Sequence, residues 1–150
     1  MIVSFEKANI NGIRTTNQRD PLMARKILIV DSSDISKKQV RNLLESADYI
    51  VYHTNSIHNI RNYLKELQID LIIIHQSLLL KESDAFDRIE EINTPMLILA
   101  SIFYDNLKVD VNQLTNVRVL RLPKSDKVIL SEINTMINTY NGKYNNRHAN

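Results

Sequence analysis

The sequence contains no cysteine and almost no glycine: 150 residues include only Gly12 and Gly142. The lack of cysteine excludes disulfide bonds, thiol nucleophiles, Cys-ligated zinc and iron–sulfur clusters, and it fits a reducing, cytoplasmic setting. Loops that cradle phosphates in P-loop and dinucleotide-binding enzymes need several closely spaced glycines. Both enzyme classes are therefore excluded.

A large excess of charge of one sign is also missing. Nineteen Lys and Arg residues balance seventeen Asp and Glu residues, for a formal net charge of +2. This balance gives no support to nucleic-acid binding by bulk electrostatics. No apolar run approaches the roughly 18–20 residues of a membrane span, and the first ten residues are too polar for a secretory signal. We therefore expect a cytoplasmic protein that does not bind membranes, and the composition gives no support to nucleic-acid binding within this chain.

Hydrophobic residues make up 43% of the chain, enough for one globular domain with its own core. Residues 1–24 show no sustained period and are predicted to be a flexible N-terminal extension. Met23 could be a second translation start, which would make residues 1–22 non-native. The domain is predicted over residues 25–140, and residues 141–150, polar and rich in Asn, are predicted to be a flexible tail.

Short apolar runs alternate with helical patterns between these ends. The runs predict buried strands at 27–30, 49–52, 71–74, 96–99 and 117–120, and Arg118 within the last run indicates an edge strand. Apolar residues at helical spacing predict helices at 36–47, 56–68, 84–92, 105–114 and 125–140. This alternation predicts an α/β fold with a doubly wound parallel sheet and helices on both faces. In such sheets, function lies at the carboxyl ends of the strands.

Four segments resemble the signature segments of the receiver domain of bacterial response regulators. They are KILIVD at 26–31, DLIIIH at 70–75, PMLILAS at 95–101 and LRLP at 120–123. The resemblance extends over residues 26–140 and implies a flavodoxin-like sheet with strand order 2-1-3-4-5. It also implies Mg²⁺-assisted phosphoryl transfer to an aspartate, and it favours a cis peptide bond between Leu122 and Pro123.

Most positions of the implied phosphorylation site are altered. Asp31 retains one member of the family's acidic pair, Ser32 replaces the other, and Asp34 lies on the wrong turn to replace it fully. His75 stands at the phosphoacceptor position, where an imidazole cannot form an aspartyl phosphate. Asp31 and Asp34 remain only weak candidates for a metal site, and we expect no bound cofactor.

The other two positions that bind the phosphoryl group are altered as well. Ala100 stands where the family has Thr or Ser, and Ser101 is displaced by one residue. Leu122 stands at the lysine position, which is identified by Pro123, and Lys124 follows that proline. Four of five site positions therefore differ from the family pattern, and we expect a degenerate pseudo-receiver with no catalytic residues.

The expected function is signal transduction through protein–protein contacts that do not depend on phosphorylation. In the family, the face formed by helix 4, strand 5 and helix 5 carries partner or dimer contacts. The resemblance therefore implies that this chain binds a protein partner or a second copy of itself. The residues expected on the binding face are Leu107, Val111, Val119, Arg121, Lys127 and Ile133.

Several alternatives stay open at this stage. His75, or a nearby acid such as Asp84, could accept a phosphoryl group in a relay, with Mg²⁺ at Asp31 and Asp34. His75 could instead bind a transition metal, or form an ion pair with Asp31 inside the emptied pocket. The chain could also be the receiver portion of a DNA-binding transcriptional regulator. The three leucines at 78–80 lie in a predicted loop, either as a packed turn or as a docking site.

Overall fold

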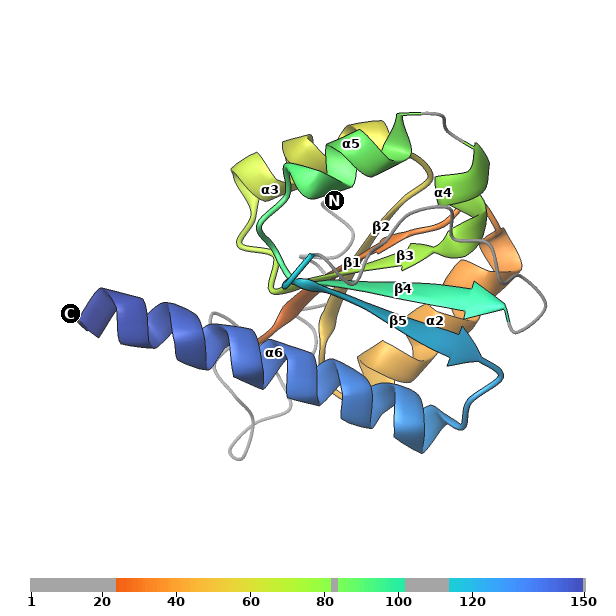
Figure 1. Ribbon diagram of the computed structural model, residues 1–150. Helices are drawn as coiled ribbons and strands as arrows, with labels where there is room; N and C mark the ends of the chain where they lie inside the picture. Colours follow the sequence, from red (N-terminus) through yellow and green to blue (C-terminus); the bar gives the residue numbers. More distant parts are fainter. Residues whose placement is uncertain (1–23, 82–83, 102–113, 150) are drawn as a thin grey trace.

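A computed structural model describes residues 24–81, 84–101 and 114–149 of the chain. Five parallel strands form its single sheet: β1 (Lys26–Val30), β2 (Ile50–Thr54), β3 (Leu71–His75), β4 (Met96–Ser101) and β5 (Val117–Leu122). Their order is β2-β1-β3-β4-β5 (Figure 1). The predicted doubly wound α/β fold and its strand order are confirmed, and β5 is an edge strand as Arg118 indicated.

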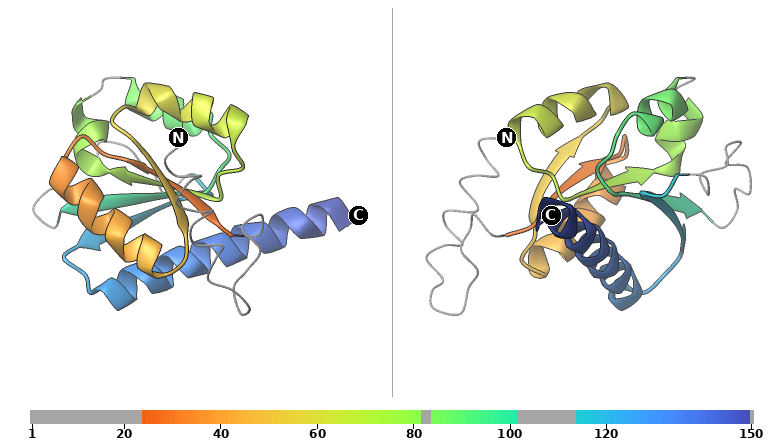
Figure 2. Two further views of the ribbon diagram at one scale, coloured as in Figure 1. Left: turned by 180° about the vertical axis from the view of Figure 1, so that it is seen from behind. Right: turned by 60° about the vertical axis from the view of Figure 1, so that its left-hand side comes forward.

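Helices cover both faces of the sheet. One face carries α2 (Asp34–Ser46) and α6 (Asp126–Ala149), and the other carries η2 (Ile57–Asn59), α3 (Ile60–Glu66), α4 (Gln76–Lys81) and α5 (Ala85–Glu90) (Figure 2). Successive strand residues contribute to opposite faces, so Leu28 and Val30 belong to one core cluster while Ile27 and Ile29 belong to the other. This explains why the inner strands are unbroken apolar runs rather than alternating ones.

The helix α4 corrects the prediction of a loop after the third strand. Residues 76–81 form a short helix. The three leucines therefore lie on different sides of this helix, some toward the core and one toward solvent. Leu78 is 2% exposed in the core, Leu79 packs against the same cluster, and Leu80 is 49% exposed. The run lacks the 3.6-residue spacing that marks a helix, because three adjacent leucines cannot all lie on one helical face.

The helix α6 is longer than the predicted segment 125–140. It continues to Ala149, so the prediction that the helix ends at Tyr140 is wrong, and Figure 1 shows it projecting past the sheet. Once a helix is nucleated on a packed face, each added residue contributes one backbone hydrogen bond without apolar burial. The change to polar residues after Tyr140 therefore does not mark the end of α6.

The predicted N-terminal extension and most of the predicted helix 105–114 lie outside the described residues. The peptide bond between Leu122 and Pro123 is cis, as the resemblance favoured. Among the described residues, none of the helices combines the length and apolar character required to cross a membrane.

Candidate functional site

The carboxyl ends of β1, β2 and β3 bring several predicted site residues to one edge of the sheet. Val30 pairs in register with Thr54 on β2 and with Ile74 on β3. The next residues are Asp31, directly after β1, and His75, the last residue of β3. These two residues therefore lie side by side at this edge of the sheet. Further along the sheet, His75 is in register with Leu99, and Ser101 is in register with Leu122.

Asp31 is a buried carboxylate held by its own turn. Asp31 directly follows β1 and is 3% exposed, and its Oδ1 accepts the backbone N–H of Ser33 at 2.9 Å. Its backbone N–H donates to the carbonyl of Thr54 at 3.1 Å. Ser32 is exposed and contributes no second carboxylate to the edge. The side chain of Asp34 lies outside the described residues.

The side chain of His75 is hydrogen-bonded to Ser77. Its Nδ1 accepts the backbone N–H of Ser77 at 3.2 Å and lies 2.9 Å from the Ser77 hydroxyl oxygen. Accepting an N–H requires a lone pair, so the proton of the neutral imidazole lies on Nε2. Among the described residues no ion pair joins His75 to Asp31, so the predicted pairing is not formed.

This contact has consequences for the two chemical alternatives at His75. Transfer of a phosphoryl group, or coordination of a metal ion, needs a free nitrogen lone pair. The lone pair of Nδ1 is already engaged by Ser77, and Nε2 holds the proton. Either alternative at Nε2 would require the proton to move to Nδ1, which would then donate to the Ser77 hydroxyl and no longer accept the Ser77 N–H.

Apolar side chains occupy the two positions that the sequence resemblance assigned to binding of the phosphoryl group. Ala100 is fully buried, and Leu122 packs against the core cluster beneath α2 and α6. Lys124 is exposed beyond Pro123. The side chain of Ser101 lies outside the described residues. A methyl group and an isobutyl group offer no hydrogen bond to a phosphate oxygen.

Asp84, the alternative acid, is engaged at the surface. Its Oδ2 accepts from Arg88 Nε at 2.8 Å, and this hydrogen bond lowers the pKa of the Asp84 carboxyl. The described residues contain no group of three or more His, Asp or Glu side chains that could hold a metal ion.

One polar contact at this edge of the sheet could not be predicted from the sequence pattern. Lys37, in the first half of α2, is 8% exposed and its Nζ donates to Oδ1 of Asn55 beyond β2. Thr54 is also buried, and its Oγ1 accepts from Nδ2 of Asn59 at 3.1 Å. A lysine among charged helix residues normally indicates a solvated face, so only the packing of α2 on β2 reveals its burial.

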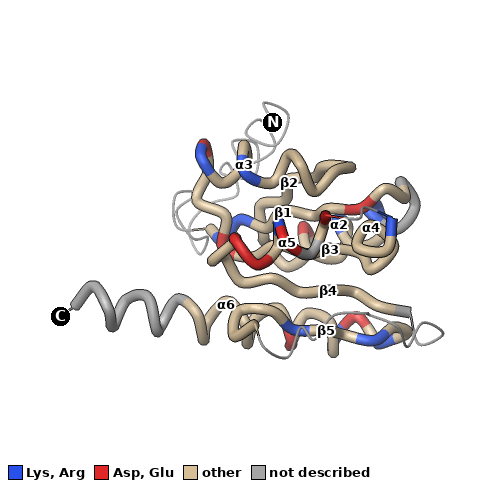
Figure 3. Tube along the Cα trace, turned by 45° about the horizontal axis from the view of Figure 1, so that its top comes forward, with Lys and Arg blue, Asp and Glu red and all other residues tan. Residues whose placement is uncertain are grey.

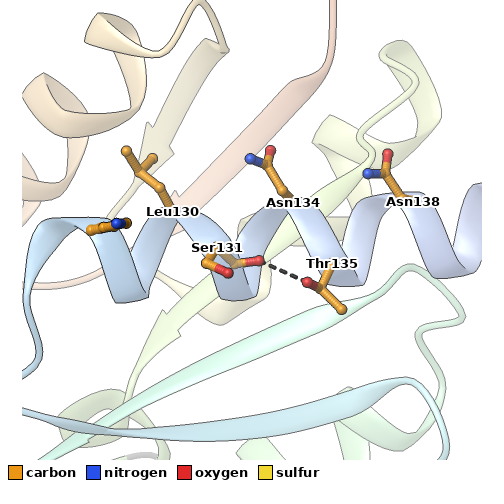
Figure 4. Close-up of a pocket in the computed structure, with 6 residues that line it drawn as sticks. Leu130, Ser131, Asn134, Thr135 and Asn138 are labelled. Atoms are coloured by element: carbon orange, nitrogen blue, oxygen red, sulfur yellow. Dashed lines mark hydrogen bonds between the residues drawn. The ribbon is translucent and has the colours of Figure 1, made fainter.

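A shallow groove of about 590 Å³ runs along α6, away from this edge (Figure 4). It is lined by Lys127, Leu130, Ser131, Asn134, Thr135 and Asn138. These positions recur at intervals of three and four residues, which places them on one side of the helix. Asn134 accepts a hydrogen bond from the hydroxyl of Tyr49, so part of this side contacts the body of the domain.

Solved structures of receiver domains share this architecture. The signal receiver domain of an HD domain-containing protein from Pseudomonas fluorescens Pf-5 superposes with a TM-score of 0.66 over 79% of this chain and 98% of that chain, at 18% sequence identity. The N-terminal domain of a response regulator/sensory box/GGDEF three-domain protein from Carboxydothermus hydrogenoformans gives 0.64 over 80% and 99%, also at 18% identity. The chain has the receiver fold.

The receiver fold also occurs in longer proteins similar to this chain. NtrX from Brucella abortus matches with a TM-score of 0.69 over 85% of this chain but only 29% of its own, at 14% identity. No protein-family model and no curated protein matches the sequence. At these identities the likeness establishes the fold, and function has to be argued from the site residues.

Proposed function

We propose that this chain is a pseudo-receiver, a signalling module of two-component type that acts without phosphorylation. The observation that carries the proposal is the state of the phosphoacceptor position. His75 occupies it, and the Nδ1 lone pair of His75 is used by Ser77. This hydrogen bond supports a structural role for His75 rather than a role as phosphoacceptor.

The neighbouring positions support the same conclusion. In the receiver reaction a divalent cation, a hydroxyl and an ammonium group stabilise the charge on the transferred phosphoryl group. Here Ser32 stands in place of the second carboxylate, the buried Ala100 in place of the hydroxyl, and Leu122, partly buried against the core, in place of the ammonium group. Restoring one group alone would leave the others missing.

The proposed output is binding of a protein partner, or of a second copy of the chain, in the cytoplasm. Basic residues lie along β5 and at the start of α6 (Figure 3), and Arg121 and Lys127 on this face are exposed. Val119 is half-buried against the core. Lys127 also lines the groove on α6. Leu107 and Val111 lie outside the described residues.

Ile133 does not belong to this face. It is fully buried among the side chains between α6 and the sheet, so its predicted place in a partner surface is wrong. Ile129, Met136 and Ile137 are buried with it. Helical spacing alone predicted an apolar stripe on α6, and this stripe is used entirely by the domain's own core.

Phosphoryl uptake tests the proposal directly. The full chain is incubated with acetyl phosphate and Mg²⁺, and its intact mass is measured beside that of His75→Ala and Asp84→Asn. We expect no adduct on any of the three proteins. An adduct that is lost in His75→Ala, or in Asp84→Asn, would show a relay component and overturn the proposal.

A fourth variant serves as the positive control for the assay. It combines Ser32→Asp, His75→Asp, Ala100→Thr and Leu122→Lys, which together restore the family's pattern at the altered positions. We expect this variant to take up phosphate and His75→Asp alone to take up much less, because the single variant still lacks the groups that stabilise the transferred charge.

A further inference from the structure

One side of α6 differs from an ordinary solvent-exposed helix face. After Lys127, the residues that line the groove and are exposed to solvent are uncharged: Ser131, Asn134, Thr135 and Asn138. Exposed helix faces usually carry Lys, Glu and Arg, which are better helix formers than Ser, Thr and Asn. Charged residues would therefore serve solvation and helix stability better at these positions, so the composition of this side favours a contact.

Four of these residues are spaced like the contact positions of two paired helices. Lys127, Ser131, Asn134 and Asn138, here called the α6 row, follow one another at intervals of four, three and four residues. Alternating intervals of three and four keep side chains in one line along a helix, as in the seam of a coiled coil. The core residues of α6, such as Ile133, lie on the opposite side of the helix.

The shape of the helix also suits a second helix beside it. The α6 row lines the shallow groove of Figure 4, and Leu130 adds an apolar side chain to its wall. With 24 residues, α6 is about 36 Å long at 1.5 Å per residue, and it projects past the sheet in Figure 1 and Figure 2. The row therefore lies on a long exposed helix rather than on a patch of irregular surface.

The chemistry of the α6 row is self-complementary. An Asn amide and a Ser hydroxyl each contain a donor and an acceptor, so each can pair with the same group on another copy. Oδ1 of Asn134 accepts from the hydroxyl of Tyr49, which fixes the amide and directs its N–H groups as donors. Lys127 carries the only charge of the row, so the row has no charge pattern that selects a strongly acidic partner.

The position of Lys127 selects the direction of pairing. It lies at one end of the row, so a parallel pair would place the two Lys127 side chains beside each other, where they repel. An antiparallel pair centred on Asn134 separates them by about 21 Å, at 1.5 Å per residue. Such a pair has a closed two-fold symmetry and places Ser131 of one copy beside Asn138 of the other.

We propose that α6 pairs in antiparallel orientation with α6 of a second copy of this chain, through the α6 row. The inference rests on the partner contact of the proposed function, and it names the partner as a second copy and the surface as the side of α6 away from the sheet. A pair of single helices buries less than the roughly 1,600 Å² of a standard interface, so the dimer is reversible.

Sedimentation equilibrium of the full chain tests the pairing, at concentrations from about 5 to about 500 µM. We expect a monomer–dimer equilibrium in the unmodified chain. Ser131→Glu combined with Asn138→Glu should raise the dissociation constant about tenfold or more, because like charges then meet in either orientation. Thr139→Glu, a change at an exposed residue beside the row, should leave the constant within about twofold.

A second pair of substitutions tests the direction. In Ser131→Glu combined with Asn138→Lys, an antiparallel pair places the introduced carboxylate of one copy beside the introduced ammonium of the other. The dimer should then be at least as stable as that of the unmodified chain. In a parallel pair, like charges would meet and the dimer would weaken. Circular dichroism confirms that each variant keeps the native fold.

Four results would overturn the proposal. The first is a monomer at every concentration, and the second is an unchanged dimer in the variant with two glutamates. The third is a dimer weakened as much by the Glu and Lys pair as by the two glutamates. The fourth is a dimer that Arg121→Glu abolishes and the two glutamates do not, which would place the contact on β5. Phosphoryl uptake is a separate measurement, so none of these results alters the test of the proposed function.

Discussion

Asp31 and Asp84 are two carboxylates with very different surroundings. Asp31 is almost fully buried at the end of β1 and accepts a backbone N–H within its own turn. Asp84 lies before α5 and forms an ion pair with Arg88 four residues later. The hydrogen bond from Arg88 lowers the pKa of Asp84, so this carboxyl is ionised and paired throughout the neutral range. A paired surface carboxylate is a poor candidate for a phosphoacceptor.

Replacing the partner of Asp84 tests this assignment. In Arg88→Gln, the pKa of Asp84 should rise toward the usual Asp value, because the main cause of its lowering is removed. The ion pair stabilises the fold above the usual Asp pKa, and this contribution is lost as the pH falls through the lowered value. A carbon-13 NMR titration of the Asp84 carboxyl measures the shift. Arg61→Gln, which breaks the pair of Arg61 with Glu91, should leave the Asp84 midpoint in place.

At the scale of elements, α4 is the part of the domain that departs most from the expected pattern. It occupies a segment predicted as a loop, it begins directly after β3, and it is capped by His75. The residue that we predict to stand at the family's phosphoacceptor position thus contacts the first turn of this helix. The connection between His75 and α4 depends on Ser77, whose backbone N–H and hydroxyl both contact His75.

The same leucine-to-alanine change at two positions of α4 tests how the helix is oriented on the core. Leu78→Ala should lower the free energy of unfolding by about 2–5 kcal/mol, because it leaves a cavity in a packed core. Leu80→Ala should change it by less than about 0.5 kcal/mol, because Leu80 is half exposed. Urea unfolding of both variants measures the difference. Equal effects would contradict the helix and favour a loop in which neither leucine is packed.

In the whole molecule, one core cluster lies on each face of the sheet. Tyr52 on β2 is buried in one cluster and lies with its ring centroid 6.4 Å from that of Tyr63. Tyr140 on α6 donates its hydroxyl to the carbonyl of Thr115. Burial raises the pKa of both Tyr52 and Tyr140, while the nearby Arg118 opposes the rise at Tyr140.

These raised pKa values predict loss of stability in alkaline solution. The folded chain favours the neutral phenols, so their contribution is fully present below the unfolded tyrosine pKa of about 10 and is lost as the pH rises above it. The urea midpoint should therefore fall between about pH 9 and pH 11. In a Tyr52→Phe, Tyr140→Phe double variant that keeps the native circular dichroism spectrum, the fall should be smaller. An equal fall in both proteins would assign it to other groups.

The sheet could be predicted from the sequence alone, because the inner strands are buried on both faces and form continuous apolar runs such as Ile27 to Val30. The placement of His75, Ala100 and Leu122 at the family's site positions rests on the sequence resemblance and stays a prediction. What these side chains contact depends on the packing of the folded chain. The capping of α4 by His75, the burial of Lys37 beside Asn55 and the loss of Ile133 from the surface all depend on how helices pack on the sheet. Packing brings together residues far apart in the sequence, and local periodicity contains no information about such pairs.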